Sequence, residues 1–131
     1  MSRTASERAL IIFFRLTMAW TFLYAASHQV FVTWSVADFL NGTKTFHPLY
    51  VHFTGPEIAP LLTFLVGYGH LLIGLSLLVG LAVRLSSIFG IALMLLYWTA
   101  HMDFPYISNN LNFIVDEHIV FAGVLVLLIV E

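Results

Sequence analysis

The sequence predicts an all-α integral membrane protein: a bundle of four transmembrane helices, with an extracytoplasmic loop between the first two. Composition is the first reason, because 60% of the 131 residues are hydrophobic and only 9% are charged. Soluble domains carry about 25% charged residues, so this chain lacks the polar residues to cover a water-soluble globule. The mean hydropathy of +0.96 and several long uncharged runs are the other two reasons. The length allows one domain over residues 1–131.

Charge and cysteine content exclude several classes of function. Five lysines and arginines against seven acids argue against a nucleic-acid partner. The absence of cysteine excludes disulfides, thiol catalysis, covalently attached c-type haem, and iron–sulfur clusters held by this chain alone. The lipid bilayer is therefore the first partner that the composition predicts.

The first predicted helix covers residues 10–33, since no charge occurs between Arg15 and Asp38. An aromatic-rich connection over residues 33–59 follows and is expected to lie on the membrane interface. Within it, Asn41-Gly42 predicts a turn and His47-Pro48 an extended step.

The second and third predicted helices cover residues 58–83 and 85–102. Gly55-Pro56-Glu57 is a helix-start signal before the first of them. The glycines inside residues 58–83 predict close helix contact or close approach of a ligand. Arg84 ends this run, and a tight turn leads directly into the third helix.

The fourth predicted helix covers residues 111–130, and its length determines where it begins. Only twelve uncharged residues separate His118 from Glu131. Twelve helical residues span about 18 Å, against about 30 Å of hydrocarbon. A spanning helix must therefore begin near Leu111, which makes Asp116, Glu117 and His118 helical and partly buried. Ionisable groups at this depth count as a functional-site hypothesis by default.

Basic residues orient the predicted bundle. Four arginines, at positions 3, 8, 15 and 84, fall at one face and Lys44 at the other. The positive-inside rule then places both termini in the cytoplasm of a multi-pass protein of the cell (inner) membrane. Arg15 is expected to reach the cytoplasmic interface and to pair there with Glu131 or the terminal carboxylate.

Polar residues recur at helical spacing in the outer half of this topology. The stripes are Thr17, Thr21, Tyr24 and His28 in the first helix, Gly67, His70 and Gly74 in the second, and Met94, Tyr97, Trp98 and His101 in the third. If the stripes face inward, they enclose a polar, aromatic-lined cavity open to the outer side. Interfacial anchoring of the aromatics and histidines, and helix–helix packing of the threonines and glycines, are the alternative interpretations.

Asp116 and Glu117 differ by about 100° on a helix, so only one of them can face inward, and the other is expected to reach the loop or to cap the helix N-terminus. Burial disfavours the charged form of the inward one unless a cation or a donor holds it. We therefore expect the inward carboxylate to bond to His28, His70, His101 or an asparagine of residues 108–112.

Several segments resemble the DoxX/DoxD family of four-helix membrane proteins. They are Arg15-Leu16, the run GLSLLVGLAVR from Gly74 to Arg84, and PYISNNLNFIVDEHIV from Pro105 to Val120. The last is similar to the DoxD-like branch, the large subunit of thiosulfate:quinone oxidoreductase. This resemblance implies a link to quinone reduction. It also implies that Asn109, Asn110, Asp116, Glu117 and His118 belong to the outer-side site.

The leading hypothesis is a membrane subunit of a quinone-linked oxidoreductase that binds quinone in the bundle. The subunit accepts electrons from a donor on the outer side, for which thiosulfate is a candidate. Without cysteine, another membrane or extracytoplasmic redox subunit must carry the sulfur. The candidate acid–base residues are Glu117, Asp116 and His70. The candidate quinone-binding residues are His28, His70, Tyr24, Tyr97, Trp98, His101, His118, Asn109 and Asn110.

Two alternatives remain open from the sequence. The first is a haem b held by histidines on different helices, such as His28 with His101 or His118, although no His-x-x-His pattern predicts metal ligands. A small accessory subunit that holds a larger membrane complex together would need no chemistry of its own.

Overall fold

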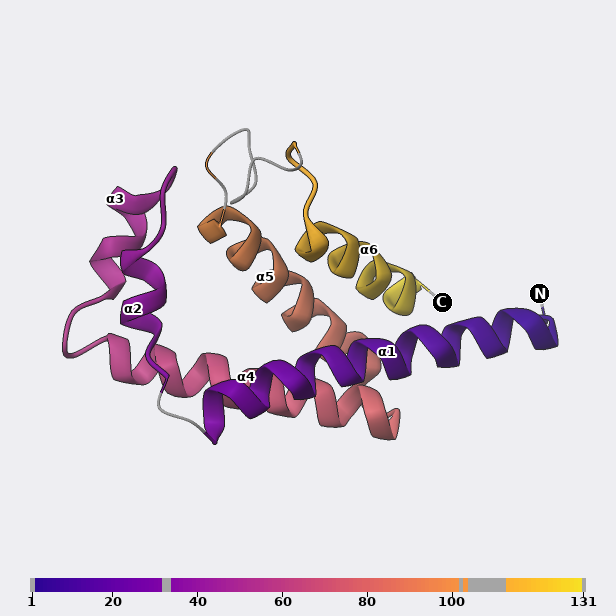
Figure 1. The fold of residues 1–131 in the computed structure, drawn as a ribbon. Coiled ribbons are helices and arrows are strands. Elements are labelled where there is room, and N and C mark those ends of the chain that lie inside the picture. Colours follow the sequence, from indigo (N-terminus) through magenta and orange to yellow (C-terminus); the bar gives the residue numbers. More distant parts are fainter. Residues whose placement is uncertain (1, 32–33, 102, 104–112, 131) are drawn as a thin grey trace.

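Helices are the regular elements of this chain in the computed structural model, which describes residues 2–31, 34–101, 103 and 113–130, with only the backbone of His101. In order they are α1 (Ala5–Val30), α2 (Val36–Asn41), α3 (His47–Tyr50), the 3₁₀ helix η1 (Val51–Phe53), α4 (Ala59–Val79), α5 (Val83–His101) and α6 (Glu117–Val130). The helix α1 packs along α4, and α5 packs along α6 (Figure 1). The short helices α2 and α3 lie together at one end of this bundle (Figure 1).

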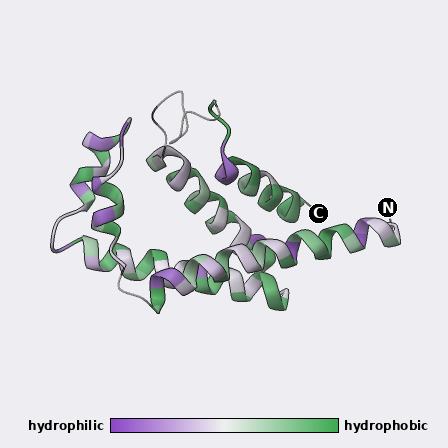
Figure 2. Cartoon of the chain, viewed as in Figure 1, coloured by the Kyte–Doolittle hydropathy of each residue, from purple (hydrophilic) through white to green (hydrophobic). Residues whose placement is uncertain are grey.

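Three helices, α1, α4 and α5, are long and apolar enough to cross a membrane. Their outward faces are apolar, with Trp20 of α1 70% exposed, Leu72 of α4 66% and Phe89 of α5 59%. Figure 2 shows hydrophobic residues along most of the four long helices and hydrophilic ones at the start of α6. A water-soluble protein would hide such side chains, so the structure is that of a helical membrane protein.

The fourth predicted span is corrected by the structure. The helix α6 is apolar but has only 14 residues, which cover about 21 Å. It begins at Glu117 because the Asp116 carboxylate caps it: Oδ1 accepts the backbone N–H of His118 at 3.0 Å and of Ile119 at 3.2 Å. Asp116 therefore precedes the helix. The predicted start near Leu111 lies outside the described residues.

Other helix ends follow capping signals that the hydropathy pattern does not contain. Thr4 and Glu7 form a reciprocal capping box, so α1 begins at Ala5 instead of residue 10. Gly80 adopts a left-handed conformation (φ 86°) and ends α4 at Val79 instead of residue 83. The predicted extended step at His47-Pro48 is wrong, because proline is favoured in a first helical turn and Pro48 occupies that place in α3.

Glycines of α4 mark an antiparallel contact with α1. A Cβ added to Gly67 would lie 3.4 Å from the Val30 side chain, and one added to Gly80 would lie 2.9 Å from Arg15 Nη1. At Gly74 the contact is closest, because an added Cβ would lie 2.7 Å from Leu23 Cγ and 3.0 Å from its backbone nitrogen. Gly67, Gly74 and Gly80 therefore give the predicted close contact with α1, and Gly69 does not.

We expect Gly74→Ala to destabilise the protein by about 1–3 kcal/mol, because its methyl group would overlap the α1 backbone. Gly69→Ala is the matched control on the same helix, since nothing lies within 4 Å of its added Cβ. That control should be neutral or slightly stabilising, because alanine favours helix more than glycine. Denaturant titration in detergent measures both; equal stability of the two variants would contradict this packing.

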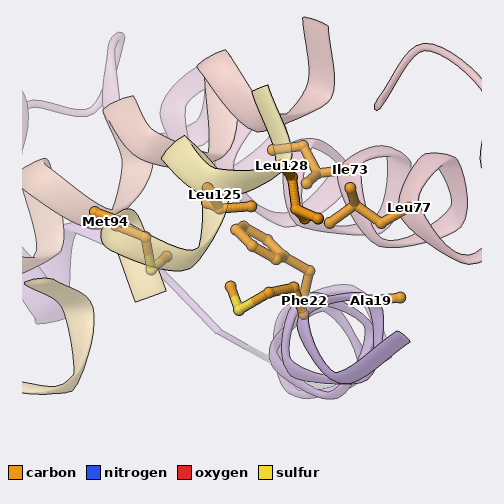
Figure 3. Packing of buried hydrophobic residues seen from close by; sticks show 9 residues of the cluster. Ala19, Phe22, Ile73, Leu77, Met94, Leu125 and Leu128 are labelled. Carbon is orange, nitrogen blue, oxygen red and sulfur yellow. The ribbon is translucent and has the colours of Figure 1, made fainter. Parts of the chain in front are cut away.

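The central core joins all four long helices. The Phe22 side chain of α1 lies among Ile73, Leu77, Met94, Leu125 and Leu128 (Figure 3). Phe22, Leu77, Leu125 and Leu128 are at most 1% exposed. This core fixes the relative position of the helices that carry the polar residues described below.

The connection between α1 and α4 folds back onto the bundle. The backbone N–H of Val36 donates to Thr63 Oγ1 of α4 at 3.0 Å. The Tyr50 hydroxyl bonds to Thr99 and donates to the Leu96 carbonyl at 3.3 Å, which fastens α3 to α5. The predicted turn at Asn41-Gly42 is confirmed, because α2 ends at Asn41. The loop predicted between the first two helices therefore contains packed helices.

Candidate functional site

A cavity of about 380 Å³ lies between α1, α4, α5 and α6. This volume falls within the range of ligand pockets, about 300–1,000 Å³. Its lining consists of Thr21, Phe22, Tyr24, Ala25 and Gln29 from α1, His70 from α4, Met94 and Tyr97 from α5, and Glu117, His118 and Phe121 from α6. Each long helix thus contributes to one partly polar site inside an otherwise apolar bundle.

Tyr97 stands at the centre of the polar residues. Its ring stacks on the His118 ring, with centroids 5.5 Å apart and an interplanar angle of 10°. The His70 ring meets Tyr97 edge-on at 5.6 Å and 76°. The Tyr97 hydroxyl accepts a hydrogen bond from Gln29 Nε2 at 3.0 Å, which ties α5 to α1. Three aromatic rings from three helices therefore form one continuous cluster.

Hydrogen bonds fix the tautomers of both histidines. His70 Nδ1 lies 2.7 Å from the Val66 carbonyl oxygen, and His118 Nδ1 lies 2.8 Å from Asp116 Oδ2. A carbonyl and a carboxylate only accept, so each Nδ1 carries a hydrogen and donates it. In each neutral ring the lone pair then lies on Nε2. The site thus holds two imidazoles that differ in one respect: only His118 is paired with an acid.

The Asp116–His118 pair is largely buried, with the two side chains 9% and 15% exposed. The inward carboxylate was predicted to bond to His28, His70, His101 or an asparagine of residues 108–112. In the structure the Asp116 carboxylate bonds to His118, and neither His28 nor His70 is its partner. The reason is the position of Asp116 before the helix, from which its carboxylate reaches forward to the side chain and backbone of His118. Glu117 is the exposed acid, although it lines the cavity.

The predicted candidates divide into three groups. The structure brings His70, Tyr97, His118, Tyr24 and Glu117 to the cavity, with Asp116 directly behind His118. Two others lie elsewhere: His28 is exposed and bonds to its own helix at the Tyr24 carbonyl, and Trp98 donates to the Ile114 carbonyl at 2.6 Å. Asn109, Asn110 and the side chain of His101 lie outside the described residues.

Gln29 is the residue that sequence reasoning missed. With Thr21 and Ala25 it forms an i, i+4, i+8 series along the cavity, next to the predicted stripe of Thr21, Tyr24 and His28. Because the middle residue of this series, Ala25, is small and apolar, the series is not recognisable as a polar stripe in the sequence. The Gln29 Oε1 atom is buried without a hydrogen-bond donor among the described residues, which marks an incompletely satisfied polar site.

A second cavity, of about 190 Å³, also has Tyr97 in its wall. The rest of its lining is apolar apart from Tyr50, and comes from α2, α3, η1, α4 and α5: Val36, Phe39, Leu40, Phe53, Leu62, Val66, Leu93, Leu96 and Ala100. Tyr97 is therefore shared by one partly polar and one apolar cavity.

The described residues contain no group of three histidines or acids placed to hold a metal ion. Of the predicted haem ligands, His118 lines the cavity and His28 does not. The structure therefore does not bring this pair to one site.

Comparison with known proteins identifies a family. No curated protein and no solved structure matches the chain. The sequence profile of the DoxX family matches residues 10–102, which is more than half of the chain and runs from within α1 to the end of α5. The match confirms the resemblance drawn from Arg15-Leu16 and the run from Gly74 to Arg84, while the DoxD-like branch stays a prediction. The chain belongs to the DoxX family.

Proposed function

We propose that this protein is the membrane subunit of a quinone-linked oxidoreductase and binds the quinone headgroup in the cavity at Tyr97. The observation that carries the proposal is the placement of two imidazoles with fixed tautomers, His70 and His118, against one tyrosine ring in a cavity of ligand size. The link of the DoxX family to quinone reduction supports the same assignment.

The two redox states of a quinone need opposite hydrogen-bond partners. A quinone carbonyl accepts, so it requires a donor such as a protonated imidazole; a quinol hydroxyl donates, so it suits a neutral imidazole Nε2. Full reduction adds two electrons and two protons to the quinone. A histidine that loses its proton as the ring is reduced therefore changes from donor to acceptor in step with its ligand.

His118 is bonded to a carboxylate, that of Asp116. A carboxylate bonded to Nδ1–H fixes the ring and stabilises the imidazolium that forms when Nε2 takes a proton. His70, in contrast, is held by a neutral carbonyl. We therefore assign proton exchange to His118 with Asp116 and orientation of the ligand to His70 and Tyr97.

The apolar cavity beyond Tyr97 suits the other end of such a ligand. Membrane quinones carry a prenyl tail, and a tail attached to a headgroup at Tyr97 would find an apolar wall there. The two electrons come from a donor on the outer side, and thiosulfate is the candidate donor. Because the chain has no cysteine to carry sulfur, that step belongs to a partner redox subunit.

Titration of the purified protein with a short-chain ubiquinone analogue, followed by tyrosine and tryptophan fluorescence, tests the proposal. We expect saturable binding that His118→Gln weakens about tenfold, the loss of one charge-assisted hydrogen bond. His52→Gln is the matched control, since His52 is exposed in η1 and lines neither cavity. No saturable binding, or equal losses in both variants, would refute the site.

A further inference from the structure

A third cavity, of about 560 Å³, lies away from Tyr97, where α4 turns into α5. Two arginines line it, Arg15 from α1 and Arg84 from α5, together with Ile11, Gly80, Ala82, Val83, Leu85 and Leu128. No acidic residue of the described chain takes part in this lining. The cavity is thus cationic, in contrast to the site at the other end of the bundle.

Arg15 is held firmly in this cavity yet incompletely satisfied. The guanidinium packs on Gly80, where an added Cβ would lie 2.9 Å from Nη1 and 3.3 Å from Cζ. Its Nε is buried and has no hydrogen-bond partner among the described residues. A buried donor of a charged group that lacks an acceptor is strongly unfavourable, so an acceptor is expected at this place.

The depth of the cavity indicates where that acceptor comes from. The 21 residues of α4 cover about 31 Å, close to the thickness of a bilayer hydrocarbon core. The turn from Gly80 to Arg84 directly follows α4, and therefore reaches the level of the lipid headgroups. At that level the abundant anions are lipid phosphates.

We propose that the cavity between Arg15 and Arg84 is a binding site for a phosphate group, supplied by the headgroup of an anionic lipid. The planar guanidinium of Arg15 presents a fork of N–H donors that matches two phosphate oxygens. Arg84, which is exposed, adds the second positive charge at the mouth. Gly80 has no side chain that would push the Arg15 guanidinium out of place.

One alternative acceptor for the Arg15 guanidinium is a carboxylate of the chain itself. The sequence predicts that Glu131 or the terminal carboxylate pairs with Arg15, and residue 131 lies outside the described residues. Leu128, three residues earlier, lines the cavity. The test must therefore separate a lipid phosphate from this internal carboxylate.

Purified protein in a neutral detergent is examined by native mass spectrometry after exchange with phosphatidylglycerol or phosphatidylcholine. We expect phosphatidylglycerol to be retained, and Arg15→Gln and Arg84→Gln each to lower its retention about tenfold. Arg8→Gln is the matched control: it removes one charge from the same helix two turns away, and Arg8 is exposed outside the cavity. Arg15→Lys keeps the charge without the fork and should retain less lipid than the wild type. Melting temperatures exclude unfolded variants.

Three outcomes would overturn the site: equal retention of both lipids, an equal loss in Arg8→Gln, or retention that appears only after Glu131→Gln removes the side-chain carboxylate or an added residue moves the terminal carboxylate away. Inorganic phosphate added without lipid distinguishes the source. Stabilisation by phosphatidylglycerol alone supports a lipid headgroup, and stabilisation by both supports a general phosphate site. This site is independent of quinone binding, because none of its lining residues lines the cavity at Tyr97.

Discussion

Asp116→Ala should lower the free energy of unfolding by about 3 kcal/mol, because one substitution removes two kinds of contact. The carboxylate caps the first turn of α6 through the N–H groups of His118 and Ile119, and such a cap is worth about 1 kcal/mol. It also accepts from His118 Nδ1 at 2.8 Å, and a hydrogen bond to a charged group contributes about 1.5–3 kcal/mol. Urea titration in detergent micelles measures the sum.

Asp116→Asn separates the two contacts. Asparagine caps helices as well as aspartate, so this variant should recover most of the cap. It has no charge to stabilise a His118 imidazolium and loses the bond from His118 Nδ1, so it should recover only the roughly 1 kcal/mol of the cap, and its affinity for the quinone analogue should fall about tenfold. Glu57→Gln is the control, since Glu57 is exposed and lines neither cavity. An Asn variant as unstable as the Ala variant would show that the charge, and not the cap, stabilises α6.

Hydropathy was sufficient to predict the long helices, and it failed where side chains end them. The spans predicted for α1, α4 and α5 overlap the observed ones because burial in lipid requires long apolar runs. The start of α6 differs by six residues from the predicted 111, since a requirement for 20 apolar residues ignores the cap that Asp116 supplies. Thr4 and Gly80 are capping residues of recognisable type, but a prediction from hydropathy does not take capping into account.

The sequence predicted how far along the helices the site residues lie, but not which helix face turns toward the cavity. His70 and His118 were both predicted to be quinone-binding residues, and the structure brings both to Tyr97. Helical periodicity could not choose between the stripe that ends at His28 and the series that ends at Gln29, because the two differ by about 100°. Only the contact of α1 with α4, set by Gly67 and Gly74, decides which of them faces the cavity.

Tyr97→Ala should have the largest effect of any single substitution in the site, a loss of about 3–5 kcal/mol of stability. It removes a ring that stacks on His118, meets His70 and Phe39, and stands in the walls of both cavities. The space it leaves adds a cavity term to the lost packing. Unfolding in detergent and the quinone-analogue titration should both show the defect.

Tyr97→Phe keeps the ring and isolates the hydroxyl. It should lower the free energy of unfolding by about 1–3 kcal/mol, because Gln29 Nε2 loses its hydrogen-bond acceptor. The Oε1 atom of the same amide already lacks a hydrogen-bond donor among the described residues. Removing both partners in Gln29→Leu/Tyr97→Phe should restore most of that stability, since no buried polar group is then left without a partner. If the pair matters to the ligand as well, the double variant will be stable but still bind the quinone analogue weakly. Additive losses in the double variant would show that Gln29 and Tyr97 act independently, and Tyr97 would then be a packing residue alone.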